Sequence, residues 1–457
     1  MKKFWIFVTL VMGIGGFTMC NKAGIFPDGG YDERLSGGIA TVFDETSKSF
    51  SHDIPGLNDR DAHIHELGDA AFEQTFVTAP APVNSGLGPV FNNVSCISCH
   101  HNDGKGTPTA GFTTSSLLFR ISISGADIHG GPLAAPGFGG QLQDVSVFGK
   151  PAEVKMNITY SDMPVIYPDG SVVVLRKPAY NVLNPYQSLP AGFMISPRLA
   201  PPVFGLGLLE NIPESTILSF ADENDKDGDG ISGKPNYVYD AFTKQTELGR
   251  FGLKANTPTI LTQAAGAYNQ DMGITNYVFP QESSYGQSQG DGLGDDPELA
   301  DSVLNSVHFY IKTLAVPARR NVTDIDVKRG QYLFAQINCS GCHKTTMQTG
   351  VDVNLPSISN QRIQPFTDLL LHDMGDGLAD NRPDFLASGS EWRTAPLWGI
   401  GLFEKTNGIP FYLHDGRART IEEAILWHGG EATKSKEAFM QLPKDHRDKM
   451  IKFLKSL

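Results

Sequence analysis

The sequence predicts a mainly α-helical fold with β insertions, divided into two domains of which the first is enlarged by a β-rich insertion. Three observations carry this prediction. The pattern Cys-x-x-Cys-His occurs twice, at residues 96–100 and 339–343. Apolar residues at helical spacing lie beside the second copy, and apolar residues that alternate with polar ones follow the first. With 457 residues, 40% of them hydrophobic, the chain can build two or three buried cores.

The first twenty residues have the pattern of an export signal. Two lysines precede an apolar run over residues 4–12, and glycines follow it. Cys20 stands where a lipoprotein is cut and acylated, although Met19 occupies a position that is usually small. We therefore expect residues 1–20 to be a signal peptide with a lipobox, followed by a linker over residues 21–65. The expected location is the periplasm or cell envelope, with membrane contact through a lipid anchor only; an incidental cysteine is the alternative.

The net charge of the chain restricts the classes of macromolecule that it can bind. Lys and Arg total 37 and Asp and Glu total 50, so the formal net charge is -13. The phosphate backbone of a nucleic acid would be repelled by such a protein. We expect no nucleic-acid partner.

Several β elements are predicted after the first Cys-x-x-Cys-His pattern. Residues 119–123 and 154–160 alternate between apolar and polar side chains, which is typical of strands. The turn residues Pro168-Asp169-Gly170 would reverse the chain into a further strand over residues 172–175. These strands form the predicted insertion.

The domain boundary is expected in a Gly-, Ser- and Asp-rich connection over residues 281–296. The two Cys-x-x-Cys-His patterns lie on opposite sides of this connection, so each belongs to its own domain. The first domain is expected to span residues 66–296 and the second residues 297–457.

Helices are predicted around the second pattern. Asp296 would cap a helix that begins at Pro297. Apolar residues share one face of a helix over residues 326–334, where Gly330 permits a close helix crossing, and a matching stripe runs over residues 450–457. Two crossing helices with Cys-x-x-Cys-His directly after the first resemble the cytochrome c fold, which we expect in both domains.

The Cys-x-x-Cys-His pattern itself indicates a chemistry. Two thiols three positions apart can add to the two vinyl groups of a haem, and the adjacent histidine can then donate a nitrogen to the iron. A closed zinc site needs four ligands, and a redox-active pair needs no following histidine. We therefore predict two covalently bound haem c groups. The expected attachment sites are Cys96, Cys99, Cys339 and Cys342, and the expected iron ligands are His100 and His343.

An acidic loop suggests a second metal. Asp225, Asp227 and Asp229 alternate along the chain with Gly230 in sixth place, like the start of a calcium loop. Position twelve is Asn236 and not the bidentate glutamate of an EF-hand. Bound Ca²⁺ and a solvated acidic turn both remain open.

Longer motifs carry a resemblance to a known family. They occupy residues 249–255, 271–275, 371–375, 391–399, 413–418 and 428–432. In this order they resemble the di-haem oxidoreductases, peroxidase-like proteins that are distantly related to bacterial di-haem cytochrome c peroxidases. The resemblance covers the chain from Leu67 to its end. It implies an enzyme with one reactive haem and one haem that relays electrons from a small redox protein or another donor. A non-enzymatic electron-transfer cytochrome is the alternative.

The resemblance also implies a further ligand for the second haem. In the peroxidase relatives a turn similar to His414-Asp415-Gly416 precedes the sixth ligand by a helix. His428 stands fourteen residues after His414, where these relatives carry methionine. We expect His428 to bind the second iron, with His372 and Met374 as weaker candidates. Two imidazoles would lower the reduction potential relative to His/Met ligation.

The first haem has no clear partner at the spacing of the relatives. His129 is the nearest candidate for its sixth ligand, and an open iron is equally compatible with the sequence. Glu153 and Glu210 are candidate acid–base groups, but no catalytic residue is assigned. Trp392 and Arg393 are candidates for an electron relay and a propionate contact.

Overall fold

The computed structural model describes residues 31–110, 115–290 and 292–457. Residues Asp32–Leu457 form one compact unit. The predicted signal peptide, including Cys20, lies outside the described residues. In the part of the chain that is described, no helix is long and apolar enough to cross a membrane.

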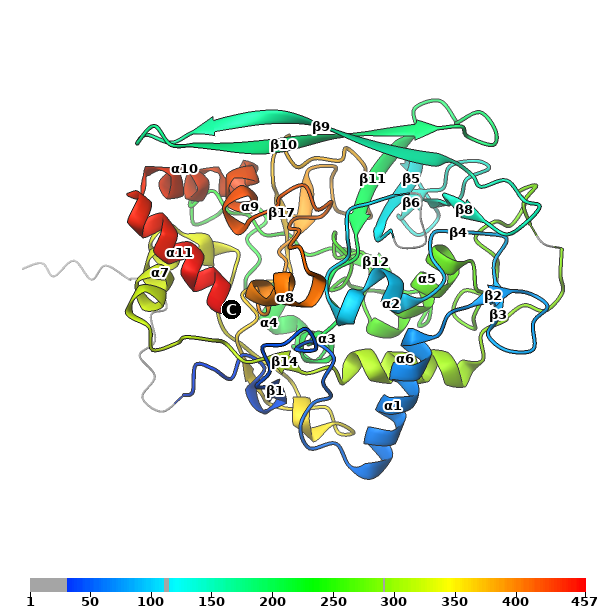
Figure 1. The fold of residues 1–457 in the computed structure, drawn as a ribbon, viewed down its shortest axis with the longest axis horizontal. Coiled ribbons are helices and arrows are strands. Elements are labelled where there is room, and N and C mark those ends of the chain that lie inside the picture. Colours follow the sequence, from blue (N-terminus) through cyan, green and yellow to red (C-terminus); the bar gives the residue numbers. More distant parts are fainter. Residues whose placement is uncertain (1–30, 111–114, 291) are drawn as a thin grey trace, which may run out of the picture. The chain divides into compact units, whose positions relative to one another are not determined.

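The helices are short, and more than half of the helical residues lie from residue 301 onward (Figure 1). Their bounds are α1 (Asp59–Glu73), α2 (Cys96–Cys99), α3 (Leu206–Glu210), α4 (Glu214–Leu218), α5 (Ile260–Met272), α6 (Asp301–Lys312), α7 (Ile325–Gln336), α8 (Phe403–Asn407), α9 (Ile421–Trp427), α10 (Thr433–Gln441) and α11 (Lys444–Ser456). The predicted start of α6 at Pro297 is wrong. The helix begins at Asp301 with Ala300 at its N-cap, and Asp296 instead accepts a hydrogen bond from Thr275 Oγ1 at 2.7 Å.

Two helix pairs cross closely, each beside one Cys-x-x-Cys-His pattern. The predicted pair is confirmed, since α7 packs against α11 and a Cβ atom on Gly330 would overlap the carbonyl oxygen of Lys449. The second pair is α1 and α6, where a Cβ atom on Gly68 would overlap the carbonyl oxygen of Ser306. Helix α6, which follows the predicted domain boundary, thus packs on α1, which precedes the first pattern. The domain boundary itself stays a prediction.

The strands form small sheets. The longest are β5 (Leu117–Ala126), β9 (Lys155–Ile166), β10 (Val172–Leu183) and β11 (Met194–Leu199). The others are β1 (Thr41–Val42), β2 (Val77–Thr78), β3 (Ser85–Leu87), β4 (Val90–Phe91), β6 (Pro132–Leu133), β7 (Gln141–Leu142), β8 (Val145–Ser146), β12 (Tyr237–Tyr239), β13 (Thr246–Leu248), β14 (Val316–Pro317), β15 (Met347–Gln348), β16 (Arg362–Ile363), β17 (Leu371–Asp373) and β18 (Glu391–Arg393). The predicted strands within β5, β9 and β10 are confirmed.

The prediction of a mainly α-helical fold with two cytochrome c-like domains is wrong. Helix accounts for 28% and strand for 20%, and the sheets have two to four strands. Helical periodicity in the sequence is strong around residues 326–334, but it is confined to a few short segments. Pairings such as β1 with β14 join residues far apart in the sequence, and each strand of that pair has only two residues. Such short strands leave no periodic pattern that could be read in advance.

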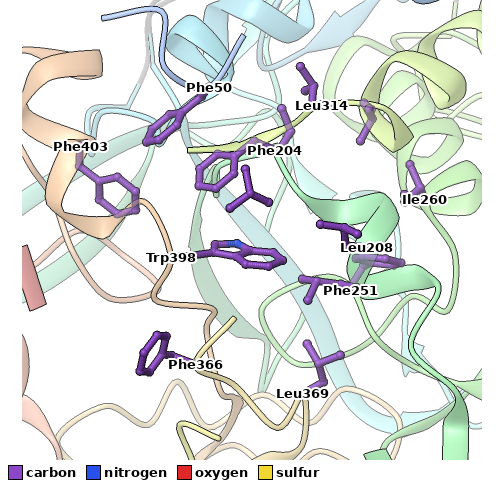
Figure 2. Packing of buried hydrophobic residues seen from close by; sticks show 14 of the residues in the cluster. Phe50, Phe204, Leu208, Phe251, Ile260, Leu314, Phe366, Leu369, Trp398 and Phe403 are labelled. Carbon is purple, nitrogen blue, oxygen red and sulfur yellow. The ribbon is translucent and has the colours of Figure 1, made fainter. Parts of the chain in front are cut away.

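The main hydrophobic core joins both halves of the chain. Phe50, Phe204 and Leu208 pack with Phe366 and Trp398 (Figure 2). A Cβ atom at Gly205 would lie 2.7 Å from the Trp398 ring, so this core is tightly filled.

The hairpin of β9 and β10 lies along the C-terminal segments near α9 and α10 (Figure 1). Tyr167 donates a hydrogen bond to Glu422 at 2.7 Å, and Tyr180 donates one to Asp415 at 2.6 Å. Near the turn of the hairpin, Asp169 lies 2.7 Å from Arg447 of α11. The hairpin of the β insertion is therefore bonded to the C-terminal part of the chain, although it belongs to the first half of the sequence.

Candidate functional site

The first Cys-x-x-Cys-His pattern forms one helical turn. Ser95 caps α2 by accepting a hydrogen bond from the backbone three residues on, at 3.3 Å, and Cys96 and Cys99 are thereby neighbours on one side of the turn. His100 follows, with Nδ1 2.7 Å from the carbonyl oxygen of Pro201. A carbonyl oxygen can only accept a hydrogen bond, so Nδ1 carries the proton and Nε2 keeps its lone pair for a metal.

The second pattern repeats this arrangement. Nδ1 of His343 lies 2.8 Å from the carbonyl oxygen of Phe366, which leaves Nε2 of His343 free to bind a metal. Burial lowers the pKa of both His100 and His343 to about 4. Both rings are therefore neutral near pH 7, as a metal ligand requires.

Each of these histidines lies beside a phenylalanine from the glycine-bearing helix. The ring centroids of Phe72 and His100 are 6.1 Å apart, and those of Phe334 and His343 are 6.2 Å apart. Both phenylalanines are buried. The two patterns thus share a thiol pair, an oriented imidazole and an aromatic wall.

The thiols are free. None of the four cysteines in the described residues is part of a disulfide. Burial raises the pKa of Cys96 and of Cys339 to about 12, so these groups are protonated near pH 7. Two free thiols, a neutral imidazole with an available Nε2 and an apolar wall fit a haem c at each pattern.

His428 follows α9 and is an electrostatic neighbour of His343, while its predicted role as an iron ligand stays a prediction. Thr420 caps α9 by accepting a hydrogen bond from the backbone N–H of Glu423 at 3.0 Å, and the Glu423 carboxylate accepts one from the backbone N–H of Arg419 at 2.8 Å. The helix ends at Trp427 and places His428 at its C-cap. Nδ1 of His428 lies 2.7 Å from the carbonyl oxygen of Ala424, so its Nε2 is also free. The pKa of His343 is lowered mainly by burial and further by the charge of His428, which makes the two rings electrostatic neighbours.

His372 has both ring nitrogens engaged. Nδ1 lies 2.7 Å from Glu431 and Nε2 lies 2.9 Å from Asp368. Burial alone would lower the pKa of His372, but the two carboxylates outweigh it and raise this pKa well above the usual value. Cys342 Sγ, Asp368 and His372 offer donor atoms within 4.8 Å of one another. Met374 follows on the same strand end, half-buried, with its carbonyl group beside Gly429.

Trp392 is enclosed by polar groups. Its indole N–H donates to the carbonyl oxygen of Leu378 at 3.0 Å, and its ring stacks on His414 with centroids 3.8 Å apart. The ammonium group of Lys254 lies 4.6 Å from the Trp392 ring centroid. Burial lowers the pKa of His414 to about 3, so this imidazole is neutral.

Arg393 has an unused donor. Its Nε donates to the carbonyl oxygen of Gly252 at 2.9 Å, while its buried Nη1 has no hydrogen-bond partner among the described residues. Asp368 is the charged group that acts on Arg393. The guanidinium therefore belongs to the neighbourhood of the second pattern.

The candidates for the first pattern are scattered. His129 is exposed and stacks on Tyr239 with centroids 3.6 Å apart, which is no place for the ligand of an enclosed iron. Glu153 is buried just before β9, where it accepts a hydrogen bond from the backbone N–H of Gln143 at 2.8 Å, and burial raises its pKa to about 8. Glu210 accepts a hydrogen bond from the backbone N–H of Ile260 at 2.8 Å. Their roles stay predictions.

The acidic loop brings the carboxylates of Asp225, Asp227 and Asp229 within 4.8 Å of one another. Asp225 accepts a hydrogen bond from the backbone N–H of Gly230 at 3.0 Å, and Lys434 donates to the carbonyl oxygen of Asp229 at 2.9 Å. Calcium binding at this loop stays a prediction.

One buried charge cluster was not anticipated from the sequence. Lys254, which is fully buried, lies 2.8 Å from Asp380. Arg198 and Arg382 each lie 3.2 Å from Asp384. The sequence offered one sign of this cluster, namely Lys254 within the motif at residues 249–255. Its partner Asp380 lies more than one hundred residues later, so the pairing could not be predicted.

Comparisons with known proteins give one family. A family model described as "Di-haem oxidoreductase, putative peroxidase" matches residues 31–457. No curated protein matches the chain. Among solved structures, Kuenenia stuttgartiensis hydrazine synthase is 20% identical with a TM-score of 0.23, over 35% of this chain and 56% of that one. The chain thus spans little more than half of that protein.

Proposed function

The chain belongs to the di-haem oxidoreductase family, and from that premise we propose that it is an exported c-type enzyme of the peroxidase-like class. One haem would be attached at Cys96 and Cys99 and the other at Cys339 and Cys342. The observation that carries the proposal is the repeated histidine geometry. At each pattern a backbone carbonyl accepts the hydrogen bond of Nδ1–H and leaves Nε2 with its lone pair available to a metal.

The two sites are proposed to have different roles. His428 has the same Nδ1–carbonyl arrangement as His343 and is its electrostatic neighbour, so these are the two residues that would hold the iron of the second haem. At the first pattern the pKa of His100 is lowered mainly by burial and further by the charge of His101, which is its neighbour in the chain and would not serve as a second ligand of the same iron. A haem iron supplies electron exchange and, with a free axial position, binding of a peroxide oxygen. We therefore assign substrate binding to the first site and electron relay to the second.

The protein environment supports each role. The carbonyl groups of Pro201 and Phe366 keep His100 and His343 in one tautomer and one orientation, which makes each Nε2 a better donor. Cys20 would attach the exported chain to a membrane through lipid, and a small redox protein or another donor would supply electrons.

The ferric protein tests this proposal. Absorption and electron paramagnetic resonance spectra should show two haems, one high-spin and one low-spin, and the denatured chain should carry the mass of both. Two low-spin haems that bind neither peroxide nor cyanide would favour the alternative, an electron-transfer cytochrome. A chain that matures without haem in a haem-competent host would refute both functions.

A further inference from the structure

The sheet of β11, β5 and β7 has two covered faces of opposite character. Phe119 and Leu142 form a cross-strand pair on one face, where each is 1% exposed within an apolar cluster. On the other face Arg120 pairs with Gln141 on one side and with Ser196 on the other. Gln141 and Ser196 are also buried. A covered sheet face made of polar side chains is costly unless each polar atom finds a partner.

Charged groups from distant segments cover this polar face. Arg198, two residues beyond Ser196 on β11, donates from Nε to Ser196 Oγ at 2.6 Å and lies 3.2 Å from Asp384. Arg382 binds the same oxygen of Asp384 at 3.2 Å. Two guanidinium groups therefore share one carboxylate.

Positive charge is in excess here. The cations are Arg120, Arg198, Lys254 and Arg382. Asp380 and Asp384 face the last three at ion-pair distance, and Asp271 is the carboxylate whose charge acts on Arg120, so four cations meet three carboxylates. Arg382 is only 4% exposed, yet its Nε has no hydrogen-bond partner among the described residues. The same holds for Ser122 Oγ on the polar face of β5, which is 1% exposed. Buried cations with free donors call for an anionic partner.

The polar face is connected to the first Cys-x-x-Cys-His pattern. Gln141 donates to Asp271 Oδ1 at 2.8 Å and to Asn92 Oδ1 at 2.7 Å. Asn93 follows, and its side-chain amide lies 3.3 Å from Cys99 Sγ. Asp271 is also a charged neighbour of Arg120 and of the Cys99 thiol.

We propose that Arg120 and Arg382 form a buried carboxylate-binding site beside the first Cys-x-x-Cys-His pattern. A guanidinium group presents parallel N–H donors that match the two oxygens of a carboxylate. The carboxylate has two sources, the propionates of the haem proposed at this pattern or the carboxylate of a substrate. The identity of the occupant rests on the proposed function, whereas the excess of buried cations does not.

The test uses the full haem-loaded chain, the variant Arg382→Gln and the control Arg60→Gln, which removes an exposed arginine of α1. Midpoint potentials are measured as a function of pH, acetate binding is measured by calorimetry, and haem content is measured separately. If propionates occupy the site, Arg382→Gln makes the potential of one haem depend on pH, and neither protein binds acetate. If a substrate carboxylate occupies it, the wild-type chain binds acetate and Arg382→Gln binds it at least tenfold more weakly.

The site is overturned if Arg382→Gln matches the wild type and Arg60→Gln in both measurements. When haem content is normal, that result leaves the proposed function intact. When the first haem is absent, calorimetry with acetate still decides the site. If Arg382→Gln does not fold, Arg382→Lys replaces it, because lysine keeps the charge but cannot offer two parallel donors.

Discussion

The two Cys-x-x-Cys-His regions hold their histidines in the same way, but the residues around the two sites differ. Each has a glycine-mediated helix crossing, a buried phenylalanine and a backbone carbonyl that holds Nδ1. Beyond these parts, the second region faces His428 and the pair of His372 and Glu431, while the first leads to Asn93 and a polar sheet face. Under the proposed function, the shared parts would hold one haem at each region, and the unshared parts would decide the role of that haem.

Removing one thiol pair at a time tests whether the two regions acquire their haems independently. We expect the double variants Cys96→Ala/Cys99→Ala and Cys339→Ala/Cys342→Ala each to lose one of the two covalent haems, because each pair supplies both thioether bonds of its own haem. Mass spectrometry of the denatured chains measures this. Loss of both haems from either variant would show that the two regions do not mature independently.

Removing His428 sharpens the difference between the two regions. We expect His428→Ala to convert the low-spin ferric signal to a high-spin one and to leave the other haem unchanged, since the alanine offers no sixth ligand. Electron paramagnetic resonance measures the change. An unaltered spectrum would reassign the ligand, with Met374 as the next candidate.

The carboxylates around His372 should make stability depend on pH in the second region. Burial opposes ionisation of Glu431, but His372 lowers its pKa from 4.5 to about 2. The ionised Glu431 therefore stabilises the fold above pH 4.5, and this stabilisation is lost as the pH falls toward 2. The protonated His372 stabilises the fold fully below pH 6.5, and this stabilisation is lost as the pH rises through its raised pKa.

Glu431→Gln should thus cost about 2 kcal/mol of unfolding free energy between pH 4.5 and 6.5, and less at lower pH. Denaturant titrations at several pH values measure this, with exposed Glu437→Gln as the control. A cost that does not shrink on acidification would contradict the interaction with His372.

The two helix crossings should respond equally to added volume. Gly68→Ala and Gly330→Ala each place a Cβ atom against a backbone oxygen of the crossing helix, so we expect each to cost about 1–3 kcal/mol. Gly140→Ala is the control, because no atom lies within 4 Å of its added Cβ. Thermal denaturation measures the three variants, and a neutral result at one crossing would make the two regions unlike.

Local signals in the sequence predicted local structure. The helix with Gly330, the strands of the β9–β10 hairpin and the nearness of His428 to His343 each follow from residues within one short segment or one known motif. The fold class was predicted wrongly because pairings such as β1 with β14 join residues of distant segments.

The polar sheet face was missed for a related reason. Alternation in β5 shows that one face is apolar, but a partly polar strand is normally solvated on its other face. Only the structure shows that Arg382 and Asp384 cover Arg198 there.

The long hairpin has a consequence for the order of folding. Its bonds from Tyr180 to Asp415 and from Asp169 to Arg447 span 235 and 278 positions of the chain. A ribosome must therefore release almost the whole polypeptide before the hairpin can dock, and contacts this distant slow the search for the native state. The two strands of twelve residues pair with each other and with no further described strand, so before docking the C-terminal segments do not cover this ribbon, and its edges can join strands of other molecules. A chain truncated before residue 415 should thus aggregate, whatever cofactor its first half has received.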